Sequence, residues 1–284
     1  MSFLKKLLGA FSPKSSGSQE PRADRMPGIL AAIEAAAQPC LRLVGREGGK
    51  SCLGGAPNIA DAWPRYEGRP LSVVAQLDLE EIAAVGGPNW LPRKGRLLFF
   101  YELDYSGWGM GPGDLGCFAV RHEAGSATPE PPPEDLPADG RWPEYPVAFV
   151  AAVSNPDPER LNVDLSGLSD REEKALETAL VAMGPHEPAH QIGGYPAPIQ
   201  ADSMELECEI VAFGLQHGAG LKPDAARKDE LRADTADWRL LLQLDTDNDA
   251  GMMWGDTGRI YFWIREQDAR AGDFSKAWMI LQCY

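Results

Sequence analysis

Carboxylates crowd one stretch of the chain, where residues 245–249 read Asp-Thr-Asp-Asn-Asp and Asp256 falls at the twelfth position. Acids at alternating positions with another at position twelve have the ligand spacing of an EF-hand calcium loop. The sixth position needs glycine for its sharp turn, however, and here it is Ala250. The flanking runs also resemble strands rather than helices. The pattern therefore favours a polar hairpin loop over a calcium site.

His186 and His190 lie four residues apart, the spacing at which two histidines on one helix bind zinc. Pro185 and Pro188 oppose a helix at this place, and no third ligand lies nearby in the sequence. We therefore predict no metal site here. We expect a loop histidine whose ring is satisfied by backbone hydrogen bonds.

Catalytic motifs are missing from the rest of the chain. No serine stands in a Gly-x-Ser-x-Gly pattern, so a Ser-His-Asp triad has no starting point. Residues 107–113 are glycine-rich but lack the lysine and following helix that cradle a phosphate, which favours a flexible loop or lid. We name no catalytic residue and no cofactor, and an enzyme is the least favoured class of function.

Two halves of the chain repeat one order of motifs. Gly54-Gly55-Ala56-Pro57, then Gln76-Leu77-Asp78, then Gly95-Arg96 and an apolar run reappear in the second half. The corresponding residues there are 193–196, 243–245 and 258–263. Two copies of so long a unit favour a pseudo-symmetric globule with a shared core over a solenoid.

Local patterns indicate which elements carry these motifs. Apolar runs and strict alternation predict strands at 71–79, 97–103, 145–153, 204–211, 238–246, 258–264 and 277–283. Helices are predicted at 29–37, 79–84 and 169–184, the last with a Ser169 and Glu172 capping box. The predicted fold is a strand-rich α+β domain built from two pseudo-symmetric repeats.

Composition divides the chain into segments. Residues 1–25 form an amphipathic leader and a flexible linker rich in Ser, Pro and Gly, and the leader can make weak membrane-surface contact. Residues 26–284 form the folded domain. Its first repeat covers about 40–125, a proline-rich connection about 127–146, and the second repeat about 147–284.

Charge and cysteine content limit the partners and the compartment. The net charge is −15, and residues 1–25 contribute five basic and two acidic side chains, so residues 26–284 carry −18. Such a body repels nucleic acid and favours a basic protein partner. The chain has no apolar run long enough to span a bilayer, no signal peptide, and five widely spaced cysteines without a paired motif. We expect a cytoplasmic protein.

Two surfaces stand out as candidate binding sites. In the predicted strand 204–211, Glu205, Glu207 and Glu209 would form an acidic ladder on the exposed face. Trp254 lies at a turn between two strands together with Asp256 and Arg259. Packing of the indole and an ion pair between the two charged residues of this turn are the favoured interpretation, and ligand contact is the alternative.

Several of these blocks closely resemble the YwqG-like family of bacterial proteins, a domain of unknown function. The resemblance covers about residues 40–284, and its most distinctive blocks are 190–200, 206–208, 238–245 and 253–263. It implies a strand-rich α+β duplication and carries over no activity, cofactor or catalytic residue. Some members accompany bacterial toxin loci, which implies an immunity or partner-binding role. The leader and the proline-rich insert near Pro131 depart from the family core.

Two hypotheses follow. The first is a non-catalytic acidic module that binds a basic protein, as an immunity or regulatory protein does. The second is a small-ligand site in a cleft between the repeats, lined by the duplicated Gln and Asp residues, which could instead only cap the backbone. The residues singled out for ligand or partner binding are Gln76, Asp78, His190, Gln200, Glu205, Glu207, Glu209, Gln243, Asp245, Trp254, Asp256 and Arg259.

Overall fold

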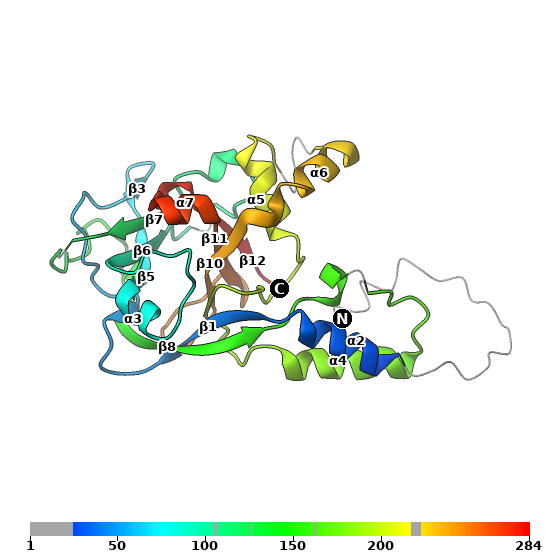
Figure 1. The fold of residues 1–284 in the computed structure, drawn as a ribbon. Coiled ribbons are helices and arrows are strands. Elements are labelled where there is room, and N and C mark those ends of the chain that lie inside the picture. Colours follow the sequence, from blue (N-terminus) through cyan, green and yellow to red (C-terminus); the bar gives the residue numbers. More distant parts are fainter. Residues whose placement is uncertain (1–24, 105–106, 126, 162, 217–222) are drawn as a thin grey trace, which may run out of the picture. The chain divides into compact units, whose positions relative to one another are not determined.

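The computed structural model describes residues 25–104, 107–125, 127–161, 163–216 and 223–284. They form two compact units (Figure 1). The smaller unit contains the described residues up to Gln38 together with Ser154–Pro185, and the larger one contains Pro39–Val153 and His186–Tyr284. The predicted leader and nearly all of its linker lie outside the described residues.

A ten-stranded sheet with the order β12-β11-β10-β9-β1-β8-β2-β5-β6-β7 dominates the larger unit. Its strands are β1 (Gln38–Gly45), β2 (Ser51–Leu53), β5 (Ser72–Asp78), β6 (Arg96–Tyr101), β7 (Phe118–Glu123), β8 (Tyr145–Ser154), β9 (Gln191–Ile192), β10 (Trp238–Asp245), β11 (Arg259–Arg265) and β12 (Trp278–Gln282). A separate hairpin joins β3 (Arg65–Tyr66) to β4 (Arg69–Pro70). The fold is strand-rich α+β, as the sequence predicts.

Two antiparallel meanders at the ends of the sheet correspond strand for strand. In β5-β6-β7, Asp78 pairs with Arg96, and the register shifts between Val73 and Ala75. In β10-β11-β12, Asp245 pairs with Arg259, and the register shifts between Leu240 and Leu242. Each irregularity therefore lies at the same distance from its Asp–Arg pair. Figure 1 shows the two meanders beside the long strands β1 and β8.

Apolar side chains cover both faces of a strongly curved sheet, in a main core and in a second cluster that contains Leu98 and Phe100 of β6. Phe99 of β6 meets Phe262 of β11 edge-on, with ring centroids 5.1 Å apart. Phe118 of β7 and Trp278 of β12 also lie 5.1 Å apart, although their strands stand at opposite ends of the strand order. The sheet therefore curls until its two edge strands meet. Every residue of β5 and β12 is buried, so both faces of these strands are covered.

Short helices accompany the sheet. The larger unit contains α3 (Leu79–Ala84), α5 (Met204–Ala212), α6 (Ala225–Arg232) and α7 (Glu266–Ala271), with 3-10 turns η1 (Pro112–Asp114), η2 (Ala138–Gly140), η4 (Thr235–Asp237) and η5 (Phe274–Lys276). No helix among the described residues is long and apolar enough to cross a membrane.

The smaller unit is built on α2 (Met26–Ala35) and α4 (Asp170–Met183), with the 3-10 turn η3 (Pro158–Leu161). Ile29 and Ile33 of α2 are buried with Leu176 of α4 in one apolar cluster. The predicted capping box at the start of α4 is confirmed, since the side chain of Ser169 accepts from the backbone N–H of Glu172, whose carboxylate accepts in return.

The prediction of a strand at 204–211 is wrong, because these residues form helix α5. Met204, Cys208 and Val211 face the main core, whereas Leu206 and Ile210 pack against Leu231 of α6. Two apolar stripes at helical spacing interleave in the sequence and together imitate the alternation of a strand. The Met, Glu and Leu residues that fill the segment are also strong helix formers.

Candidate functional site

Polar side chains line one face of the sheet around the second meander. The strand register places Arg42, Gln191, Gln243 and Tyr261 opposite one another on β1, β9, β10 and β11. Two residues further along, Asp245, Arg259 and Gln282 are opposite one another in the same way. Because partners across strands and residues two apart share a face, all seven side chains point to one side, which we call the polar face.

The polar face holds the backbone of a loop that has no regular structure. The backbone N–H of Ala197 donates to Oε1 of Gln243 at 2.8 Å, and its carbonyl accepts from Arg259 and Tyr261 at 2.9 and 2.8 Å. The N–H of Ile199 donates to Oε1 of Gln282 at 2.9 Å. The polar face thereby satisfies backbone groups that no strand or helix pairs.

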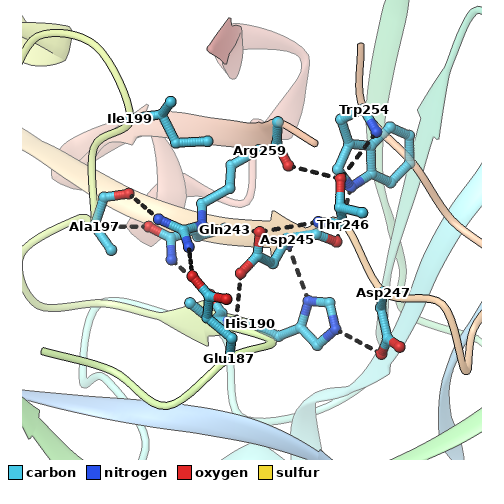
Figure 2. A network of polar contacts seen from close by, with 12 residues as sticks. Glu187, His190, Ala197, Ile199, Gln243, Asp245, Thr246, Asp247, Trp254 and Arg259 are labelled. Atoms are coloured by element: carbon cyan, nitrogen blue, oxygen red, sulfur yellow. Dashed lines mark hydrogen bonds and ion pairs between the residues drawn. The ribbon is translucent and has the colours of Figure 1, made fainter. Parts of the chain in front are cut away.

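Arg259 and Asp245 form a buried ion pair at the centre of this face (Figure 2). Nε of Arg259 lies 2.9 Å from Oδ1 of Asp245, and the two side chains are only 9% and 7% exposed. Burial opposes the charged form, but contact with the carboxylate of Asp245 outweighs it and raises the pKa of Arg259. Asp245 also accepts from the backbone N–H of Ala189 and Thr246, and Arg259 contacts Glu187 at 3.2 Å.

His190 lies beside this ion pair and is 2% exposed. Figure 2 shows its ring between the backbone of Asp245 and the carboxylate of Asp247. Nδ1 accepts from the N–H of Asp245 at 3.1 Å, so the ring proton must reside on Nε2, which donates to Asp247 at 3.1 Å. This hydrogen bond lowers the pKa of Asp247. The prediction that backbone hydrogen bonds satisfy the ring is confirmed for Nδ1 only, because Nε2 bonds to a side-chain carboxylate.

The described residues contain no group of three or more His, Cys, Asp and Glu side chains that could hold a metal ion. His186 is exposed, whereas His190 is buried. The arrangement offers an acid, a base and a charged pair, but each is hydrogen-bonded within the chain. The contacts of this arrangement hold loops in place.

The corresponding residues of the first meander play related parts. Oε1 of Gln76 accepts from the N–H of Asn58 at 2.7 Å, and Asn58 occupies the loop position that Ala197 occupies in the second half. Asp78 caps α3 by accepting from the N–H groups of Glu80 and Glu81, as predicted for a helix start. The duplicated Gln and Asp side chains are thus bonded to the backbone in both halves.

The turn that carries Trp254 is packed into the structure. Trp254 is fully buried, and its indole N–H donates to the carbonyl of Asp245 at 3.0 Å. Its ring also meets Tyr101 and Trp142 edge-on. The predicted pairing of Arg259 with the exposed Asp256 of the same turn is wrong, because Arg259 pairs with Asp245 and Glu187.

The three glutamates of the predicted acidic ladder do not line one exposed face. Glu209 is 1% exposed and accepts from Trp238 Nε1 and from Arg265. Glu205 and Glu207 are half-buried on α5, where residues two apart point in different directions. Gln200 donates its backbone N–H to Gln282 and its side-chain amide to the carbonyl of Cys283.

Sequence reasoning missed four members of the polar face: Arg42, Gln191, Tyr261 and Gln282. Only Arg42 interrupts an apolar run inside its strand, between Leu41 and Leu43, and a polar residue inside such a run is the one signal that the sequence offered. A shallow pocket elsewhere, near the β3-β4 hairpin, was also missed, and it is lined by Tyr66, Arg69, Pro70, Leu71, Glu102, Leu103, Asp104, Asp135 and Pro137.

Comparison with known proteins gives one finding about relationship. A family model described as a domain of unknown function (DUF1963) matches residues 51–283. This range spans both meanders and the whole polar face except Arg42. A comparison with curated proteins found no match. Because the matched range covers most of the chain, the chain belongs to the DUF1963 family.

Proposed function

We propose that this protein is a non-catalytic acidic module that binds a basic protein partner, in the manner of an immunity or regulatory protein. The resemblance to the YwqG-like family supports the same role, because some members of that family accompany bacterial toxin loci. A cytoplasmic location fits as well, since all five cysteines are free and buried.

One observation carries the proposal: the proline-rich connection displays a dense group of carboxylates. Between residues 127 and 143 the only basic side chain is Arg141. The acidic side chains of this segment, all exposed, are Glu130, Glu134, Asp135 and Asp139. We call residues 127–143 the acidic segment.

The acidic segment is held against the rest of the larger unit, which makes it a defined surface. Pro129 forms an antiparallel bridge with Asn58, and Arg141 donates to the carbonyls of Pro133, Glu134 and Leu136. Its prolines also restrict the preceding residues to extended conformations. A surface already ordered before binding loses less conformational entropy when a partner docks.

Charge gives this surface a partner class. Exposed carboxylates on a body of net charge −18 steer a basic protein toward themselves and raise its association rate. Such steering weakens as salt rises, because the Debye length falls from about 30 Å at 0.01 M to about 8 Å at 0.15 M.

The alternative is a small-ligand site lined by the duplicated Gln76, Asp78, Gln243 and Asp245. It has less support, because each of these side chains is bonded to the backbone of the chain itself. Catalysis by these side chains also has less support than partner binding, because the same hydrogen bonds to the backbone occupy them.

Affinity capture from the lysate of its own cells, at low and at moderate salt, tests the proposal. We expect one basic protein at near-stoichiometric yield, with less recovered at the higher salt. An empty capture at both salt concentrations would contradict the proposal. So would a captured partner whose yield does not change with salt.

A further inference from the structure

Arg42 and Gln191 are partners across strands β1 and β9, and each has a buried polar atom without a hydrogen bond. Nη1 of Arg42 is an unpaired donor, and Oε1 of Gln191 is an unpaired acceptor. Gln191 is fully buried, and its amide N–H groups are already used by the carbonyls of Gly193 and Tyr195. Among the described residues, nothing offers a donor to Oε1.

The first half of the chain provides an internal comparison. Cys52 pairs with Gln76 on one side and with Pro146 on the other, as Gln191 pairs with Gln243 and with Arg42. Cys52 and Pro146 therefore occupy the positions that Gln191 and Arg42 occupy in the second half. The sheet forms at this place with two side chains that bring no unpaired polar atom.

The fold alone therefore does not require the polar pair, and unpaired buried groups lower stability. Groups that cost stability and have no structural partner are typical of binding sites. We propose that Arg42 and Gln191 bind a small oxyanion that also carries a hydroxyl group.

The two unpaired atoms define this ligand class. A guanidinium N–H binds phosphate or carboxylate oxygens, which matches Arg42. Oε1 of Gln191 can only accept, so the ligand must also donate, as the hydroxyl of hydrogen phosphate or of an α-hydroxy acid does. Sulfate and acetate accept equally well but have no hydroxyl to donate.

A second guanidinium lies close to Arg42. Burial, and then the nearby Arg259, lower the pKa of Arg42, so an anion between these groups would relieve an unfavourable contact. The carboxylates closest to Arg259 are those of Asp245 and Glu187. Arg42 as a whole is half-buried, and its Nη1 is buried.

Calorimetric titration of the full chain with four probes at one ionic strength tests the proposal. The probes are inorganic phosphate against sulfate, and glycolate against acetate. We expect the hydroxyl-bearing member of at least one pair to bind about tenfold more tightly than its match, the effect of one unpaired buried group. The pair that responds distinguishes a phosphate ligand from a hydroxy acid. No binding of any probe, or equal binding within both pairs, overturns the proposal.

Two variants separate this site from a structural role. Arg42→Met should abolish probe binding and raise the melting temperature of the free protein, because it removes an unpaired buried charge. Gln191→Cys copies the internal counterpart, and it should remove the preference for the hydroxyl within the pair that responds. The proposal fails if Arg42→Met still binds the probes or lowers the melting temperature of the free protein.

Discussion

Replacing Arg259 with methionine should destabilise the protein strongly. The change leaves Asp245 buried and charged without its cation, and the pair is too well covered for solvent to screen it. The hydrogen bond to Ala197 adds little, because the hydroxyl of Tyr261 still donates to the same carbonyl. Breaking one partner of a buried pair costs about 3 to 5 kcal/mol. At about 2 to 4 °C per kcal/mol, the melting temperature should fall by about 6 to 20 °C.

The first half of the chain supplies the matched control. Asp78 corresponds to Asp245, but its cation is Lys50, which lies 3.7 Å away and is 57% exposed. Such a pair contributes about 0 to 1 kcal/mol, so Lys50→Met should barely change stability. Urea unfolding followed by tryptophan fluorescence measures both variants. Equal losses, or a loss under about 1.5 kcal/mol for Arg259→Met, would refute the reasoning.

Three further predictions concern other parts of the larger unit. His190 holds the pKa of Asp247 below its usual 3.8, so this stabilisation is present above about pH 4 and is lost as the pH falls through the lowered value. In acid titrations followed by circular dichroism, Asp247→Asn should therefore lose less stability than the wild type between about pH 5 and pH 3. An unchanged profile would contradict this. Gly109 and Gly251 both have positive φ, but only at Gly109 would an added Cβ clash with a backbone carbonyl, that of Met279. In thermal unfolding, Gly109→Ala should therefore lower stability by several times the roughly 1 kcal/mol expected for Gly251→Ala. Similar losses for the two variants would be evidence against this close contact between Gly109 and Met279. Burial raises the pKa of Cys52 to about 11, so iodoacetamide should modify it only after unfolding, as read by mass spectrometry, and rapid labelling of the native protein would contradict the burial.

The sequence predicted most of the sheet because its signals are local. Strands such as β5 and β10 are rich in Val and Leu, and α4 begins at a complete capping box. These patterns depend on residues close together in the chain. The α5 segment failed because its two buried stripes face different elements, the main core and α6. Local alternation cannot distinguish that arrangement from a half-exposed strand.

The site was only half visible for a different reason. Gln243, Asp245 and Arg259 stood out because they recur in both halves of the sequence. Arg42 and Gln191 gave no such signal, since β1 meets β9 only through a register set by the tertiary fold. The same non-local packing turned Glu209 from an expected surface acid into the buried partner of Arg265.

The account of a charged binding surface can be tested most directly by comparing capture between two variants. One replaces Glu130, Glu134 and Asp139 with amides and leaves Asp135 in its ion pair with Arg65. The control neutralises the same number of exposed acids elsewhere: Glu34, Glu47 and Asp61. We predict that only the first variant loses the basic partner from lysate at moderate salt, with both variants as stable as the wild type. Equal recovery of the partner by both variants would contradict the account.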